Sequence, residues 1–179
     1  MLEQMTHRLL SQRTFEAAAE TLLNDVVALH GAEYGDLQLM IGNELVVVAQ
    51  RGLSAAFLQA FRRVRRDDGC ACGRALRLGR TVVVPDVARD PEYMVFWKDA
   101  EAAGYRAVQS TPLVTQSGKV LGMVSTMFAN VHEPTPIELQ TLMYYSRIAA
   151  DYLAKLLTGE TMAAKAEQMN RALYADVVA

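Results

Sequence analysis

The stretch that decides the fold is GYRAVQSTPLVTQSGKVLGMVSTMF, residues 104–128. It contains two apolar segments, residues 105–114 and 119–128, which flank the short turn Gln116-Ser117-Gly118. A glycine-containing turn between two segments of this length is typical of a β-hairpin. Both segments are therefore predicted to be strands, and a connection this short implies that they pair in antiparallel orientation.

The two faces of this predicted hairpin differ in chemistry, because successive side chains point to opposite faces of a strand. One face mixes methionines, hydroxyls and one guanidinium: Arg106, Val108 and Ser110 on the first strand, and Met123, Ser125 and Met127 on the second. The opposite face suits packing under helices: Tyr105, Ala107 and Gln109, and Val120, Gly122, Val124, Thr126 and Phe128. Methionine adapts to irregular shapes, and isolated polar groups orient ligands. The first face is predicted to be a pocket wall, although Met123 and Met127 as ordinary core residues remain an alternative.

Further elements extend outward from the hairpin. Apolar residues recur at three- and four-residue steps from Phe15 to Leu29, which predicts a helix with one buried stripe. Segments 36–41 and 44–50, separated by Gly42-Asn43, predict a second hairpin. The rest of the chain predicts helices at 55–64, 72–79 and 94–103, a strand at 81–87, and a long helix after the capping box Thr135-Pro136-Ile137-Glu138.

The chain resembles a GAF domain from about residue 14 to residue 158. The likeness rests on three segments: CGRALRLGRTVVVPDVARDPEY (72–93), AGYRAVQSTPLVTQSGKVLGMVSTMF (103–128) and HEPTPIELQTL (132–142). They are similar to GAF modules found beside PAS and histidine-kinase modules in bacterial sensors. The resemblance implies an α+β fold, an α/β sandwich. Its central antiparallel sheet of five to six strands would carry the terminal helices on one face. Short helices and loops would close a pocket on the other.

This resemblance also implies a domain division. Residues 1–13 would be an N-terminal helical extension, residues 14–158 the GAF domain, and residues 159–179 a C-terminal helical extension or a linker to an output module. In bilin-binding members, the positions that match Val108, Ser110 and Met127 face the chromophore.

A second pocket wall is predicted from the segment before the decisive hairpin. Tyr93, Phe96 and Trp97 lie at steps that place them on one side of the helix at 94–103. Trp97 covering the sheet without touching a ligand is the alternative. The guanidinium of Arg106 needs an anionic partner. That partner is either an anionic ligand or a carboxylate of the preceding loop, Asp86 or Asp90, which would make Arg106 a structural latch.

The candidates for thiol chemistry are Cys70 and Cys72, the two cysteines of the chain. The segment CACGRAL resembles a segment of free methionine sulfoxide reductases, in which Cys72 would match one of their cysteines. The attacking cysteine of those enzymes falls near Tyr93-Met94, where this chain has none. The two cysteines, Cys70 and Cys72, form a candidate redox pair. No catalytic residue is predicted, and the chain is not expected to be an enzyme.

Other sites are not expected. The three histidines lack ligand spacing, so no metal site is predicted, and no cofactor is identified. The haem-ligating histidine of haem-binding GAF sensors falls at Arg106, and the cysteine motif of bilin-binding members is absent. The net charge of −2 and the aspartates that end FRRVRRDD (61–68) favour a solvated helix end over nucleic-acid binding. The apolar stretches are too short for membrane insertion. Without a signal-peptide pattern, and with two thiols, the predicted location is the cytoplasm.

The final long helix predicts a partner chain. Its residues Leu139, Leu142, Ser146, Ala149, Leu153 and Leu156 are spaced as a heptad seam. We therefore expect a parallel homodimer through helices 1–30 and 136–157. The alternative is that this stripe belongs to the core of its own chain. The leading hypothesis is a non-enzymatic sensory or regulatory domain that binds a small molecule and signals through its helices to a histidine kinase or another output domain. A thiol reductase and a dimerisation scaffold without a ligand are the alternatives.

Overall fold

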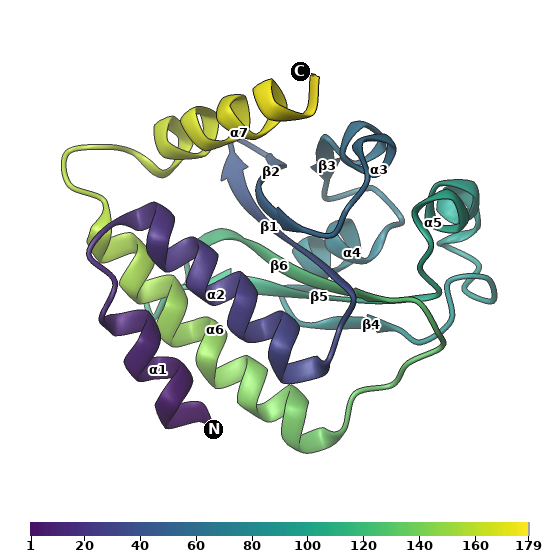
Figure 1. Ribbon diagram of the computed structural model, residues 1–179, viewed down its shortest axis with the longest axis horizontal. Helices are drawn as coiled ribbons and strands as arrows, with labels where there is room; N and C mark the ends of the chain where they lie inside the picture. The colour runs from purple at the N-terminus through teal and green to yellow at the C-terminus, as the bar shows by residue number, and fades with distance from the viewer. Residues whose placement is uncertain (179) are drawn as a thin grey trace.

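The computed structural model describes residues 1–178, and its centre is a six-stranded antiparallel sheet (Figure 1). The strands are β1 (Tyr34–Ile41), β2 (Glu44–Arg51), β3 (Arg63–Arg65), β4 (Val82–Val84), β5 (Ala107–Val114) and β6 (Val120–Phe128). They are ordered β3-β2-β1-β6-β5-β4 across the sheet. The predicted α+β sandwich with a sheet of five to six strands is confirmed.

Helices cover both faces of this sheet (Figure 1). On one face lie α1 (Leu2–Leu10), α2 (Phe15–His30) and α6 (Pro136–Leu156), and they form a first core with the sheet. On the other face lie α3 (Ala55–Ala60), α4 (Ala71–Leu78), the single-turn η1 (Met94–Phe96) and α5 (Trp97–Ala103), and they form a second core. The last helix, α7 (Met162–Val178), contributes residues to both cores.

The decisive hairpin forms as predicted, with β5 and β6 paired antiparallel from Ala107↔Phe128 onward. Two face assignments are wrong. Val120 packs on the second core, because a bulge between Leu113 and Val114 shifts the register at that end of the hairpin. Tyr105 is also buried in the second core, because it precedes the strand, where the alternation of side chains does not apply.

The predicted helix at 55–64 is shorter than expected. It ends at Ala60, and Arg63–Arg65 forms β3, which pairs with Glu44–Val46 of β2. Val64, at the centre of β3, is 1% exposed. The burial of this β-branched side chain against the sheet overrides the helical pattern. The basic run is therefore an edge strand with its arginines in solvent, not a helix end.

The heptad seam of α6 gives no evidence for a partner chain. Leu142, Ser146, Ala149 and Leu153 are buried within the chain, and α6 packs on β5 and α2. A helix that lies between a sheet and two other helices needs a wide apolar face, and the middle of the predicted seam belongs to that face.

The N-terminal helix α1 packs in the first core. Met5 and Leu9 are buried in that core. The Arg8 guanidinium donates two hydrogen bonds to Asp25 Oδ1, at 2.7 and 3.0 Å. The Tyr145 hydroxyl donates to the other oxygen of Asp25 at 2.6 Å. This buried carboxylate ties α1, α2 and α6 together.

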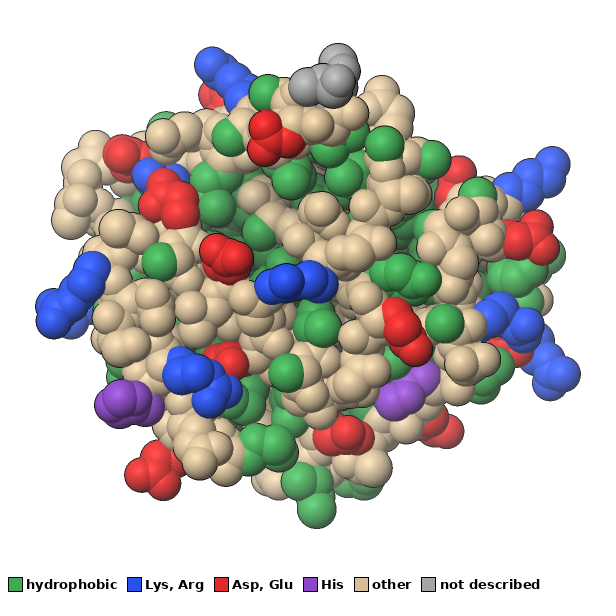
Figure 2. All heavy atoms as spheres, viewed as in Figure 1, with side chains coloured by type: hydrophobic (Ala, Val, Ile, Leu, Met, Phe, Trp, Pro, Cys, Tyr) green, Lys and Arg blue, Asp and Glu red, His purple; other side chains and the backbone are tan. Residues whose placement is uncertain are grey.

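The C-terminal helix α7 covers the free edge of β2. Since β3 pairs with only three residues of β2, Glu44–Val46, the edge of β2 continues without a strand partner. The Asn170 amide of α7 donates to the Val47 carbonyl at 2.7 Å. Figure 2 shows hydrophobic side chains gathered along the seam below α7. Residues 159–179 were expected to be an extension or a linker, and in the described part they pack as a helix against the sheet.

Candidate functional site

Five polar side chains are buried together in the second core, between the sheet and α4. These residues, here called the buried polar cluster, are Asp36, Gln38, Cys72, Ser110 and Ser125. The sheet register explains their proximity, because Asp36 of β1 pairs with Ser125 of β6, which pairs with Ser110 of β5. Each of the three side chains points to the same face, so they form a row across adjacent strands.

Hydrogen bonds connect the hydroxyls and the thiol of this cluster. The Ser110 and Ser125 hydroxyl oxygens lie 2.8 Å apart. The Ser110 hydroxyl also donates to the Cys72 sulfur at 3.5 Å, and the Ser125 oxygen lies 3.6 Å from the same sulfur. The position of Cys72 follows from α4, which begins directly after Cys70 and presents Cys72 to the sheet. The side chains of Cys72, Ser110 and Ser125 therefore find hydrogen-bond partners within the cluster.

Asp36 and Gln38 differ from the rest of the cluster. Neither carboxylate oxygen of Asp36 and neither amide atom of Gln38 has a hydrogen-bond partner among the described residues. The two side chains are 1% and 0% exposed. Burial raises the pKa of Asp36 well above its usual range, Cys72 adds to the rise, and Ser125 only partly offsets it. The cluster therefore contains a carboxyl group whose protonated form burial favours, and an amide without a partner among residues 1–178.

Aromatic rings enclose one side of the cluster. The Tyr93 and Tyr105 hydroxyl oxygens lie 2.9 Å apart, and both rings are buried. Burial raises the pKa of Tyr93 well above its usual range, so the pair stays protonated. Phe96 packs against Tyr93 with ring centroids 5.8 Å apart. Phe57 packs against Tyr105 at the same centroid distance. These rings give the cluster an apolar wall.

The two cysteines are reduced and buried, at 1% exposure for Cys70 and 6% for Cys72. A contact between the two thiols lowers the pKa of Cys70 and, together with burial, raises the pKa of Cys72 well above its usual range. Cys70 is therefore the first of the two to ionise. Because attack by a thiol needs an accessible thiolate, the closed structure does not expose a nucleophile.

Arg106 lies at the rim of the site and is held by a carboxylate. Its guanidinium donates to both oxygens of Asp86 at 2.8 Å, and its Nε donates to Oδ1 at 3.0 Å. These hydrogen bonds lower the pKa of Asp86. The guanidinium carbon lies 5.8 Å from the centroid of the Trp97 ring. Of the two alternatives for Arg106, the geometry is that of a latch between the Asp86 loop and β5.

The structure brings six of the nine predicted ligand-binding residues together in the second core: Tyr93, Val108, Ser110, Met123, Ser125 and Met127. Phe96 and Trp97 are partly buried against this core, and Arg106 lies beside Trp97. The prediction missed Asp36 and Gln38. Their signal was present in DLQLMI, where two polar residues alternate with apolar ones in a segment otherwise suited to a buried strand.

The cluster is closed to solvent, and α7 forms part of the closure. The Tyr174 side chain of α7 is 7% exposed and lies in the second core, where its hydroxyl donates to the Leu58 carbonyl. The Arg62 guanidinium stacks over its ring at 4.9 Å. Burial raises the pKa of the Tyr174 hydroxyl, and the Arg62 guanidinium partly offsets the rise. Tyr174 therefore closes the second core where α7 meets α3.

Two further observations limit the site. Within residues 1–178, no group of three or more His, Cys, Asp or Glu side chains is arranged to hold a metal ion. None of the helices in that range is long and apolar enough to span a membrane.

Comparison with known proteins gives the family. The family model described as GAF domain matches residues 12–154, most of the chain. The chain belongs to the GAF family. The match begins between α1 and α2 and ends inside α6, so it covers the sheet, α2 to α5 and the whole buried polar cluster. No curated protein sequence is significantly similar to the chain.

Solved structures share the GAF fold at low sequence identity. The GAF domain of a phosphoenolpyruvate-protein phosphotransferase from Coxiella burnetii is 19% identical, with a TM-score of 0.72 over 86% of this chain and 90% of that one. Free methionine-R-sulfoxide reductase from Neisseria meningitidis, solved with its substrate, is 20% identical, with a TM-score of 0.67 over 86% and 87%. A domain assigned to a two-component sensor histidine kinase from Sinorhizobium meliloti is 17% identical, with a TM-score of 0.64 over 81% and 94%.

Proposed function

We propose that this GAF domain is a non-enzymatic sensory or regulatory module. It binds a small molecule in the buried polar cluster and passes the signal through its terminal helices to an output module such as a histidine kinase. The family assignment and the likeness to a domain from a sensor histidine kinase support the sensory role. The free thiols of Cys70 and Cys72 favour a cytoplasmic location.

The observation that carries the proposal is the pair of unpartnered side chains, Asp36 and Gln38. A buried polar group without a hydrogen bond costs about 1–3 kcal/mol of stability. A scaffold without a ligand gains nothing from that cost, whereas a binding site uses such groups to orient its ligand. Because Gln38 offers an N–H donor and an oxygen acceptor, and a protonated Asp36 offers the same pair of functions, the ligand class that fits is a small molecule such as an amide, with both N–H donors and acceptor oxygens.

The coupling to a terminal helix follows from α7. This helix contacts the site through Tyr174 and contacts α2 through an ion pair, with Lys165 Nζ 2.9 Å from Glu16. A ligand that displaces Tyr174 therefore loosens one end of α7 while the other end stays attached. This differential contact is what a ligand needs in order to shift a conformational equilibrium.

Native mass spectrometry of freshly purified protein is the first test, because it detects a retained small molecule. A panel of amine- and amide-bearing metabolites then follows, against analogues that carry only carboxylates. Gln38→Leu should abolish binding. Gln109→Leu is its matched control, because Gln109 is an equally buried and unpartnered glutamine of the same sheet that points to the first core. Equal loss of binding in both variants, or no binding by any donor-bearing compound, would refute the proposal.

A thiol reductase is the second candidate, and one observation favours it. Cys72 lies inside the buried polar cluster, and the fold is shared with a free methionine-R-sulfoxide reductase. Turnover of methionine sulfoxide with a thiol reductant would establish it, and Cys70→Ser and Cys72→Ser would each have to abolish that turnover. The burial of both thiols favours the sensory function.

A homodimer through helices 1–30 and 136–157 remains part of the proposal, on different residues from the heptad seam. Apart from Met143, which lines a groove beside β5, the exposed large apolar residues of these segments are Met1, Leu10, Ile137 and Tyr144, at 64%, 47%, 70% and 47%. Sedimentation at micromolar concentration should show a dimer that Tyr144→Glu converts to a monomer. A monomeric wild-type protein would refute this part alone.

A further inference from the structure

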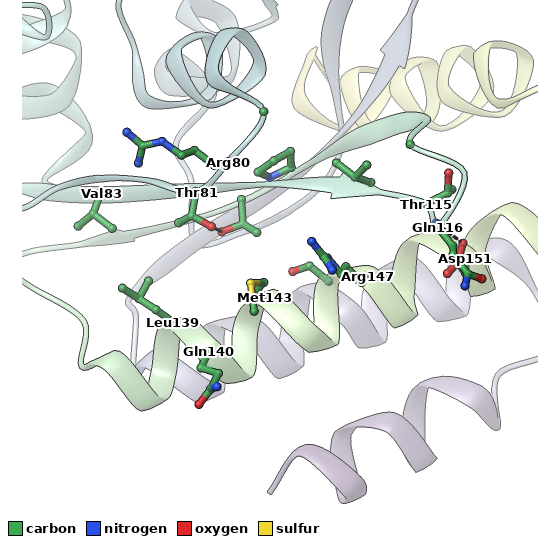
Figure 3. Close-up of a pocket in the computed structure, with 16 residues that line it drawn as sticks. Arg80, Thr81, Val83, Thr115, Gln116, Leu139, Gln140, Met143, Arg147 and Asp151 are labelled. Atoms are coloured by element: carbon green, nitrogen blue, oxygen red, sulfur yellow. Dashed lines mark hydrogen bonds between the residues drawn. The ribbon is translucent and has the colours of Figure 1, made fainter.

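A groove lies between α6 and strands β4 and β5, on the sheet face opposite to the buried polar cluster. Its volume is about 1170 Å³. It occupies the place where β4 ends and the edge of β5 continues, since β4 pairs only with Val108–Ser110. In Figure 3, side chains of Thr81 and Val83 point from the strands toward α6. The groove is distinct in position and lining from the site proposed above.

The apolar part of the groove comes from both walls. Val83 faces Leu139 and Met143 of α6 across the opening (Figure 3). Met143 is 40% exposed, so its side chain is accessible from the groove. Pro112 and Val114 extend this apolar surface along β5. The groove therefore offers contact area to an aliphatic or aromatic group.

The charged part of the groove is positive at its centre. Arg147 projects from α6 toward the strands, whereas the Arg80 side chain extends on the other side of the strands, away from α6 (Figure 3). Among the ion pairs of the described residues, neither guanidinium has a carboxylate within 4.0 Å. The carboxylate of the groove, Asp151, accepts a hydrogen bond from the backbone N–H of Gln116 at 3.0 Å and so belongs to the hairpin end.

Hydroxyl groups lie on both walls. The Thr81 and Thr111 oxygens are 2.9 Å apart, so one of the two protons remains available to another acceptor. Ser146 lines the groove from α6, is 2% exposed, and its hydroxyl has no hydrogen-bond partner among the described residues. Two donors on opposite walls, with a guanidinium beside them, match the oxygens of a carboxylate.

We propose that this groove binds a small amphipathic anion, an aliphatic or aromatic carboxylate. Its carboxylate lies between Arg147 and the threonine pair, and its apolar part lies over Val83, Leu139 and Met143. A peptide strand fits less well, because Pro112 lacks an N–H and interrupts any ladder along the open edge of β5. A ligand in this groove contacts α6, a helix of the first core. The groove is thus a second ligand site, independent of the buried polar cluster.

Decanoate is the test probe, with decyltrimethylammonium as the probe of equal chain length and opposite charge. Calorimetric titration of the full chain should show binding of decanoate that weakens with salt, and much weaker binding of the ammonium compound. Arg147→Gln should weaken decanoate binding roughly tenfold. Lys155→Gln, the same loss of charge on an exposed residue of the same helix outside the groove, should leave it unchanged.

A second pair of variants tests the apolar part. Met143→Trp places a bulky ring where the apolar part of the ligand would lie and should weaken decanoate binding, whereas Tyr144→Trp, at the neighbouring exposed position outside the groove, should preserve it. Asp36→Asn should leave decanoate binding unchanged. Failure of the groove proposal is therefore distinguishable from failure of the proposed sensory site. Equal binding of both probes would overturn the proposal. Equal loss of decanoate binding in Arg147→Gln and Lys155→Gln would also overturn it. So would a dimer whose interface covers the groove and which Met143→Trp dissociates.

Discussion

The two edges of the sheet end in short strands, but the described chain covers them differently. β3 pairs with three residues of β2, and β4 pairs with three residues of β5, so each longer neighbour keeps a free stretch of edge. Along β2 this stretch is covered by α7, and Asn170 satisfies the Val47 carbonyl. Along β5 it borders the groove beside α6 and carries Pro112.

This difference shows two ways to manage an exposed strand edge. A covering helix satisfies backbone groups and adds buried area, so it contributes to stability and also shields what lies behind it. A proline in the free edge withholds one N–H from any partner strand and leaves the space beside it open. In this protein the covered edge protects the buried polar cluster, and the open edge provides a groove with unpaired arginines.

The largest effect is expected from removing the anchor of the covering helix. Tyr174→Ala should lower the free energy of unfolding by about 3 kcal/mol, because it leaves a cavity in the second core and an unpaired Leu58 carbonyl. Urea unfolding measures the loss. Arg171→Ala, an exposed change on the same helix, should stay within about 0.5 kcal/mol. Similar losses in both would mean that α7 does not cover the edge as described.

The covered edge should also determine how Asp36 responds to pH. Burial raises its folded-state pKa above the unfolded value of 3.8, so the unfolded chain releases its proton first and stability falls as the pH rises through the folded-state pKa. Asp36→Asn lacks this proton and should be more stable than the wild type by about 1–2 kcal/mol at about pH 8. The gain should shrink at about pH 4 and in the Tyr174→Ala background, where water reaches Asp36. Thermal unfolding at a series of pH values measures this gain in stability, and a gain that does not depend on pH would contradict the prediction.

A smaller effect is expected from the hydrogen bond that satisfies the β2 edge. Asn170→Ala should cost about 1 kcal/mol, since it leaves the Val47 carbonyl without its side-chain donor. Amide hydrogen exchange should then rise along β2 more than along β5. Gln168→Ala, a change elsewhere on α7, is the control, and exchange that rises equally in both variants would contradict the role of Asn170.

The smallest effect on stability is expected at the open edge. Pro112→Val should change the free energy of unfolding by about 0.5 kcal/mol, through the greater freedom of the unfolded chain. Its main consequence should be self-association at high concentration, because β5 would then offer an uninterrupted ladder. Light scattering compares it with Val114→Thr, which leaves the proline in place. A variant that stays as dispersed as the wild type would show that Pro112 does not protect this edge.

Much of the candidate site was predictable from strand alternation. Val108, Ser110, Met123, Ser125 and Met127 reached the second core because both strands of the hairpin are regular over those positions. The alternation failed at Val120 and Tyr105, where a bulge and a strand boundary interrupt it. Asp36 and Gln38 were overlooked, although the same alternation in β1 places them on that face.

The sequence by itself determined the elements that depend on local patterns: the two hairpins, the capped start of α6 at Thr135, and the amphipathic helix α2. Only the tertiary structure decided which apolar stripe of α6 is internal, that Arg63–Arg65 joins the sheet, and that α7 returns to cover β2. The physical reason is that a local pattern shows which side chains avoid water. Which surface buries them depends on elements that lie far apart in the sequence.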